Sequence, residues 1–175
     1  MIRWRKTQHG GFTLLEVLIA LLVISTGLLG IAAMQASAIS NTHASQTESL
    51  VALQARSLAD AMQANTVYWK GGLAPSTIAV ASSTLGDSTL EGISTDCTQG
   101  TCTAQQLASY DLKQWGIQLN NLVPGATGNI TCQVAAPSEC TIQVSWSQKA
   151  ATAINQGTQS TSTPTNLTYT LVNQF

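Results

Sequence analysis

Charge is scarce in this 175-residue chain, because Asp, Glu, Lys and Arg together make up only 9% of it. Three of the seven cations, Arg3, Arg5 and Lys6, lie within the first six residues. From Phe12 onward four cations stand against all eight acids, which gives that part a formal net charge of −4. Nucleic acids need a basic surface, so no direct nucleic-acid partner is expected. The length allows one folded domain plus an anchor.

Histidine is also rare, with only His9 and His43 in the chain. No Ser-His-Asp set, nucleophile elbow, phosphate loop or metal-ligand cluster is visible, so the sequence predicts no enzyme, no cofactor and no metal. Asp111 is an isolated candidate for a catalytic carboxylate. Burial with a hydrogen bond from the backbone or from Trp115 is the simpler interpretation, because no second carboxylate stands at a useful spacing.

Proline is absent from residues 12–68, and all four prolines follow at position 75 or later. The sequence therefore permits one helix of about 55 residues and about 80 Å. Residues 17–34 contain no charge. As a helix they span roughly 27 Å, close to the hydrocarbon thickness of a bilayer, about 30 Å.

Glu16 opens this apolar run. A carboxylate at mid-bilayer costs roughly 2.5 to 3.5 kcal/mol, so Glu16 is predicted to have a functional role and a pairing partner. A secretory signal peptide would have a shorter apolar stretch with its small-residue cleavage site after it. A plain membrane anchor would explain the run and give no reason for Glu16.

From Ser40 onward apolar and polar residues recur at helical spacing. This pattern predicts an amphipathic helix that packs on a globular head. Its predicted buried stripe consists of Thr47, Leu50, Gln54, Leu58, Ala61, Met62, Asn65 and Trp69. Glu48, Arg56 and Asp60 lie off the stripe. Residues 71–102 are rich in Gly, Ser and Thr and predict a long loop with one short strand near 78–81.

Regular structure resumes at Thr103, which is expected to cap a helix over 104–122. Period-two alternation then predicts a hairpin of strands 130–134 and 140–146 and a third antiparallel strand near the C-terminus, 167–175. The polar segment 147–166 between them is either a solvated linker or an interaction loop.

The cysteines all lie in the C-terminal half: Cys97, Cys102, Cys132 and Cys140. The basic N-terminus stays in the cytoplasm, so the cysteines are predicted to lie outside, where disulfides form. Of three connectivities, Cys97–Cys102 and Cys132–Cys140 are preferred, because Gly100 and Pro137 can turn the intervening loops. The spacings C-x4-C and C-x7-C fit zinc knuckles poorly.

A basic leader, Gly11, Phe12, the run Thr13-Leu14-Leu15-Glu16 and a long apolar helix together resemble type IV pilins and the pseudopilins of type II secretion. The resemblance implies that a prepilin peptidase cuts after Gly11 and that the new amino group on Phe12 is N-methylated. It also implies an α+β, pilin-like fold, with the long N-terminal helix packed on a small antiparallel sheet.

The resemblance divides the chain into four parts. They are a cleaved cytoplasmic leader, a membrane or filament-core half of the helix, an amphipathic half, and a globular disulfide-containing head: residues 1–11, 12–39, 40–70 and 71–175. By the same resemblance Glu16 pairs with the ammonium of Phe12 on a neighbouring subunit, which would neutralise both charges inside an apolar helix bundle.

Residues 18–35, LIALLVISTGLLGIAAMQ, are similar to minor pilins of the PilV type. The cysteine pairs, Asp111 and Trp115 on a helix, the run at 122–125 and the closing Val144-Ser145-Trp146 add to this similarity. It implies a minor pilin that primes or joins a type IV pilus and supports twitching motility, adhesion or DNA uptake. A type II secretion pseudopilin is the close alternative, and a membrane-tethered periplasmic enzyme or metal-binding domain is a remote one.

The resemblance also implies the partners and the location. The partners would be other minor pilins, the major pilin, the prepilin peptidase and methyltransferase, the inner-membrane assembly platform, and membrane lipid before assembly. The chain would cross the bacterial inner membrane once, with its N-terminus cytoplasmic and its head periplasmic, and would then enter a pilus at the cell surface.

Overall fold

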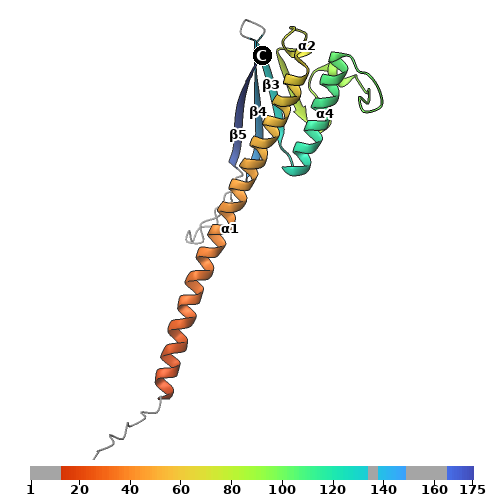
Figure 1. Ribbon diagram of the computed structural model, residues 1–175. Helices are drawn as coiled ribbons and strands as arrows, with labels where there is room; N and C mark the ends of the chain where they lie inside the picture. Colours follow the sequence, from red (N-terminus) through yellow and green to blue (C-terminus); the bar gives the residue numbers. More distant parts are fainter. Residues whose placement is uncertain (1–12, 134–137, 149–164) are drawn as a thin grey trace, which may run out of the picture. The chain divides into compact units, whose positions relative to one another are not determined.

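The computed structural model describes residues 13–133, 138–148 and 165–175, and within this set it leaves out the side chains at 37 and 40. The chain divides into two compact units, Met1–Asn41 and Thr42–Phe175 (Figure 1). Helix α1, Leu14–Ala64, contributes residues to both units. The short helix α2, Thr66–Trp69, follows it directly.

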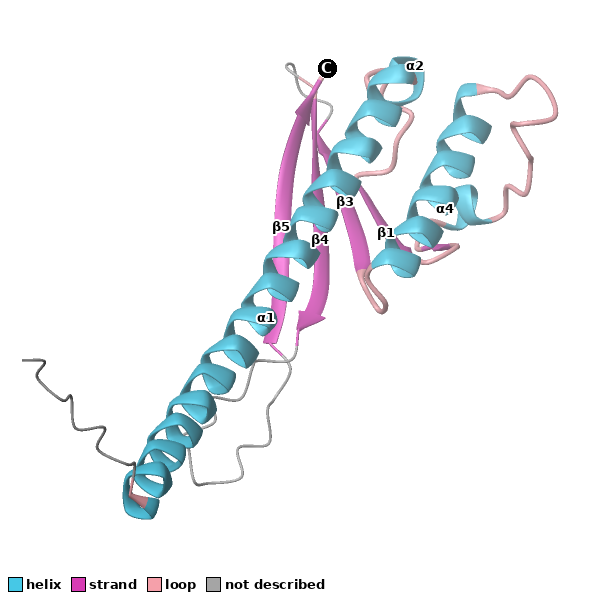
Figure 2. Cartoon of the chain, turned by 60° about the horizontal axis from the view of Figure 1, so that its bottom comes forward, coloured by secondary structure: helices cyan, strands magenta, loops and turns pink. Residues whose placement is uncertain are grey.

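A five-stranded antiparallel sheet forms the centre of the second unit, in the order β2-β1-β3-β4-β5 (Figure 2). The strands are β1 Thr77–Ala81, β2 Thr84–Leu85, β3 Thr127–Gln133, β4 Glu139–Gln148 and β5 Thr165–Gln174. Strands β3, β4 and β5 are the three that the alternation predicted, and each begins one to three residues earlier than predicted. The α+β, pilin-like fold class is thereby confirmed.

Only one face of the sheet is buried, because side chains alternate between the two faces along each strand. In β4 the buried residues are Cys140, Ile142, Val144 and Trp146, and the residues between them are half-buried or exposed. In β1 the same alternation buries Ile78 and Val80. The buried face carries α4 and the C-terminal part of α1, so the second unit has two layers.

The amphipathic stripe on α1 is partly confirmed. Leu58, Met62 and Asn65 are buried, as is Trp69 in α2. Thr47, Leu50, Gln54 and Ala61 are only half-buried. The centre of the stripe instead includes Val51 and Ala55, both fully buried, together with Ala59.

Helix α4, Ala104–Leu122, has the predicted bounds. Thr103 forms a reciprocal capping box with Gln106, in which each side chain accepts a hydrogen bond from the backbone N–H of the other residue. This arrangement satisfies two backbone donors at the helix start. Leu112, Trp115 and Leu119 are buried in the core, whereas Leu122 at the end of the helix is 47% exposed.

The region 71–102 contains more structure than the predicted loop. The expected short strand is β1, but β2 and the helical turn α3, Ser88–Glu91, follow it. Asp87 caps α3 by accepting hydrogen bonds from the backbone N–H groups of Thr89 and Leu90. The segment was predicted as loop because these elements are only two and four residues long, too short for a visible period.

Both cysteine pairs preferred from the sequence are present as disulfides, Cys97–Cys102 and Cys132–Cys140. Cys132 and Cys140 are directly opposite residues of β3 and β4, with their Cα atoms 4.1 Å apart. The Cys132–Cys140 disulfide thus links two neighbouring strands covalently, while Cys97–Cys102 closes a loop just before α4. Most of the 147–166 segment lies outside the described residues.

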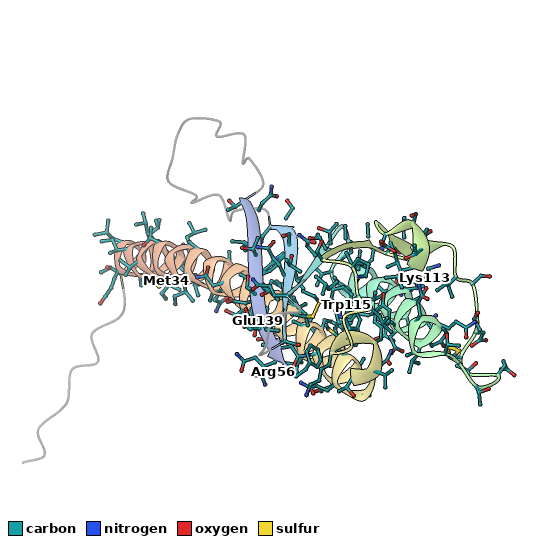
Figure 3. All side chains as sticks on the ribbon, turned by 90° about the horizontal axis from the view of Figure 1, so that it is seen from above. Met34, Arg56, Lys113, Trp115 and Glu139 are labelled. Carbon is teal, nitrogen blue, oxygen red and sulfur yellow. A yellow bond between two sulfur atoms is a disulfide. The ribbon has the colours of Figure 1, made fainter. Side chains whose placement is uncertain are left out.

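Polar side chains fix α1 to its neighbours within the second unit. The indole Nε1 of Trp115, the side chain labelled in Figure 3, donates to the carbonyl of Gln54 at 2.8 Å. The amide of Asn65 donates to the carbonyl of Ala104 at 2.7 Å. Because these groups are half-buried or buried, each bond removes a desolvation cost of about 1 to 3 kcal/mol.

Two glycines permit the close packing of α4 on the sheet. A Cβ atom on Gly128 of β3 would stand 2.5 Å from the ring of Trp115. A Cβ atom on Gly116 of α4 would stand 2.6 Å from Cγ1 of Val80 and would meet the carbonyl oxygen of Ser82. Backbone cannot move aside as a flexible side chain can, so Gly116 is the stricter requirement.

We therefore expect Gly116→Ala to destabilise the protein, even though alanine is the better helix former. Overlap of the added Cβ with backbone puts the overpacking cost in the upper part of its usual range of about 1 to 3 kcal/mol, whereas the higher helix propensity of alanine offsets about 1 kcal/mol. The apparent Tm of the full chain in detergent should fall by about 2 to 8 °C. Gly100→Ala is the control, because nothing lies within 4 Å of its added Cβ. An unchanged Tm for Gly116→Ala would contradict the packing described here.

Candidate assembly site at the start of helix α1

The described part of the candidate site is the first turn of α1. The backbone N–H of Glu16 donates to the side-chain oxygen of Thr13 at 3.3 Å and to its carbonyl at 3.1 Å. Thr13 is therefore the residue that caps the helix, and Glu16 is its third helical residue. An acid is favoured there by the partial positive charge of the helix N-terminus. The sequence reasoning noted the Thr-Leu-Leu-Glu run but missed this capping role.

Glu16 is exposed, and within residues 13–133, 138–148 and 165–175 it has no ion pair. Gly11 and Phe12, the predicted cleavage and methylation residues, lie outside the described residues. The pairing of Glu16 with Phe12 on another subunit therefore remains a prediction.

The apolar stretch after Glu16 is helical and exposed. One 18-residue window of α1 has a mean hydropathy of 2.5, none of it is buried, and its length and composition suit a membrane span. Ser25 and Thr26 do not break its apolar character, since their hydroxyls donate to the carbonyls of Leu21 and Leu22 at 2.7 and 3.1 Å. A hydroxyl satisfied inside its own helix can enter an apolar environment at low cost.

Asp111 does not have the partner that the sequence suggested. Of the two donors that the sequence suggested, the backbone or Trp115, the indole of Trp115 donates to Gln54 instead. Among the residues that the structure describes, Asp111 has no hydrogen-bond or ion-pair partner and stands half-buried on α4. Desolvation raises the pKa of its carboxyl above the ordinary value.

Among the described residues, no group of three or more His, Cys, Asp or Glu side chains is placed to hold a metal ion. The four cysteines are consumed by the two disulfides. His43 is exposed on α1.

Comparison with known families gives one match. Residues 6–32 match the model of the prokaryotic N-terminal methylation motif, which covers the leader from Lys6 onward, the Gly11-Phe12 junction, Glu16 and most of the apolar run. No curated protein and no solved structure shows significant similarity to the chain. The motif and the fold together indicate a type IV pilin-like prepilin, and such a protein is a structural subunit that assembles with other pilins.

The raised pKa of Asp111 generates a pH-dependent prediction. The pKa of this carboxyl is higher in the folded protein than in the unfolded chain. Above its folded pKa, the ionised carboxyl therefore lowers the free energy of unfolding. This penalty is relieved as the pH falls toward the unfolded value of about 3.9. Asp111→Asn should therefore have a higher Tm than the wild type at pH 7, and the difference should shrink as the pH falls to about 4.

Glu48→Gln is the matched control, because Glu48 is an exposed carboxylate in the middle of α1. Its substitution should leave the Tm nearly unchanged at both pH values. An equal gain from both substitutions, or a gain for Asp111→Asn that does not depend on pH, would contradict the desolvation argument.

Proposed function

We propose that this chain is a minor pilin of the PilV type, a structural subunit that primes or joins a type IV pilus and so supports twitching motility, adhesion or DNA uptake. The observation that carries the proposal is the methylation motif at residues 6–32, which is followed by an exposed apolar helix and then by an α+β head. In this proposal a prepilin peptidase removes residues 1–11 and Phe12 becomes the N-methylated first residue.

The proposed role of Glu16 follows from its surroundings. It stands one turn from the proposed new N-terminus, at the edge of an apolar surface that needs either lipid or other helices around it. An unpaired ammonium or carboxylate carries a large desolvation cost in an apolar helix bundle, whereas an ion pair of the two neutralises both charges. Pairing between Glu16 of one subunit and Phe12 of the next would set the axial register of the filament.

The same arrangement supports a two-stage location. The cations at the N-terminus hold that end in the cytoplasm, and the disulfide-bonded head lies in the periplasm. Lipid covers the apolar segment 12–39, which includes the first part of α1, before assembly, and the helices of neighbouring pilins replace the lipid in the filament. The partners are then other minor pilins, the major pilin, the processing enzyme and the inner-membrane assembly platform.

A pseudopilin of type II secretion is the second candidate, because it shares the N-terminal motif. The segment at residues 18–35 and the two disulfides favour the pilus. The remote alternative, a membrane-tethered enzyme or metal-binding domain, has only the isolated Asp111 to support it.

Gly11→Val tests the processing step. A branched side chain at the cut site should exclude the scissile bond from the peptidase, and the chain should remain a precursor 11 residues longer on a gel. Mass spectrometry should find methylated Phe12 at the N-terminus of the wild type but not of Gly11→Val. Gly100→Val, placed in a head loop where a Cβ has open space, should be processed like the wild type. Normal cleavage of Gly11→Val would refute the assignment of the site.

Glu16→Ala tests the pairing and the choice between the two systems. In a deletion strain, the variant should be processed but should enter sheared surface filaments poorly, as judged by immunoblot of the pilus and membrane fractions. Glu48→Ala, an exposed glutamate farther along the same helix, should assemble normally. Wild-type incorporation of Glu16→Ala would remove the pairing argument. Loss of exoprotein secretion with surface pili intact in the deletion strain would favour the pseudopilin.

A further inference from the structure

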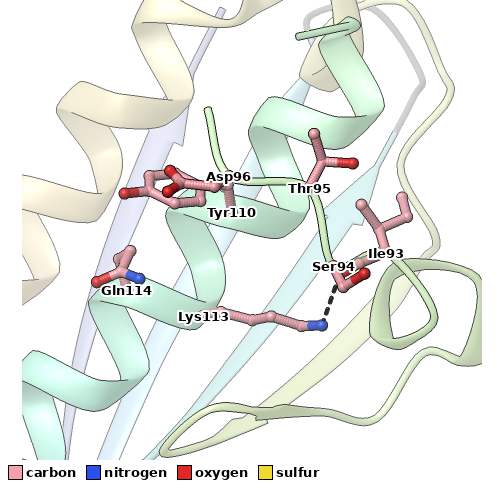
Figure 4. Close-up of a pocket in the computed structure, with 7 residues that line it drawn as sticks. All are labelled: Ile93, Ser94, Thr95, Asp96, Tyr110, Lys113 and Gln114. Carbon is pink, nitrogen blue, oxygen red and sulfur yellow. Dashed lines mark hydrogen bonds between the residues drawn. The ribbon is translucent and has the colours of Figure 1, made fainter. Parts of the chain in front are cut away.

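An open cavity of about 310 Å³ lies between α4 and the loop that follows α3. Figure 4 shows its two walls: residues 93–96 form the loop wall, and Tyr110, Lys113 and Gln114 of α4 form the helix wall. The volume is at the lower end of the range for small-molecule sites. None of these residues belongs to the N-terminal motif or to the buried core.

The loop wall is fixed to α4 at its start. The ammonium of Lys113 donates to the carbonyls of Glu91 and Ile93, both at 2.8 Å, and stands 3.8 Å from the carboxylate of Glu91. One turn earlier on α4, the buried hydroxyl of Ser109 donates to the carbonyl of Leu90 at 2.7 Å. The chain that enters the loop is thus held by two side chains of the opposite wall.

The loop is fixed at its other end as well. Asp96 accepts hydrogen bonds from the backbone N–H of Thr98 at 2.9 Å and from its hydroxyl at 2.7 Å. The disulfide Cys97–Cys102 begins at the next residue. A wall held at both ends needs little further ordering when a ligand binds, which lowers the entropic cost of binding.

Two charged side chains of opposite sign, Asp96 and Lys113, line the cavity. The hydrogen bonds from Thr98 lower the pKa of Asp96, so this side chain carries a negative charge at neutral pH. Lys113 supplies one positive charge, and its donors already point at carbonyls and at Glu91. An anionic ligand would face Asp96, and a cationic ligand would face Lys113. The electrostatics therefore favour a neutral ligand.

The remaining groups both donate and accept hydrogen bonds. The side chains of Ser94, Thr95 and Gln114 are exposed and that of Tyr110 is half-buried, and all four line this one cavity. Hydroxyls and amides of this kind match a ligand whose own groups donate and accept at once. The ring of Tyr110 adds an apolar face, against which the C–H groups of a sugar ring can lie.

We propose that this cavity binds one neutral sugar unit, held by hydrogen bonds to Gln114 and Asp96 and by contact with the ring of Tyr110. This function is additional to filament assembly and independent of the N-terminal motif. Its failure would leave the pilin proposal intact, and the reverse also holds.

The test uses the full chain in a zwitterionic detergent that has no sugar headgroup, titrated by ligand-observed NMR. The neutral probes are glucose, galactose, mannose and N-acetylglucosamine, and the charged comparators are glucuronate and glucosamine. We expect at least one neutral sugar to bind with a Kd of about 1 mM, the scale for about a dozen heavy atoms in an open site. Both charged sugars should bind more weakly than this neutral sugar.

Gln114→Ala should weaken that binding about three- to tenfold, the range for one lost hydrogen bond, and Tyr110→Ala should weaken it at least as much. Gln118→Ala is the matched control, an exposed glutamine one turn farther along α4 that does not line the cavity. Unchanged Tm values would show that the variants fold. The proposal is overturned if no neutral sugar binds, if a charged sugar binds best, or if Gln114→Ala and Gln118→Ala bind alike.

Discussion

Burial of a single sheet face is the constraint on which the second unit depends. Because side chains alternate along β1, β3 and β4, every second residue must be covered, and α4 and the C-terminal part of α1 supply that cover. Close approach is possible only where Gly116 and Gly128 leave out a side chain. Trp115 lies at this junction: its ring packs on Gly128 and its N–H bonds to the backbone of α1.

The first part of α1 has the opposite character. It is an apolar surface that the described chain leaves exposed, and Glu16 stands in its first turn beside the cap formed by Thr13. Such a surface is stable only against lipid or against other helices. The chain thus combines a self-sufficient folded unit with a segment that needs partners, as expected of an assembly subunit anchored in a membrane.

Local signals explain which parts of the fold could be predicted. Helix α4 was predicted to the residue because Thr103 and Gln106 form a cap that needs no distant partner. The three long strands were visible because each carries several periods of alternation. The elements β2 and α3 were not predicted because each is only about one period long, so neither repeats its pattern. The predicted stripe on α1 left out Val51 and Ala55 because the approach of the sheet, rather than the helix pattern, determines which residues are covered.

For the candidate sites the division is similar. The sequence alone determined the methylation motif, the apolar run, the place of Glu16 and the long helix, because these depend on neighbours close in the chain. The tertiary structure decided that the Trp115 indole donates to the carbonyl of Gln54, so it is not a partner of Asp111. It also brought Asp96 together with Tyr110 and Gln114 in the lining of one cavity. These facts depend on how a loop and a helix meet in space, and no spacing in the sequence carries that information.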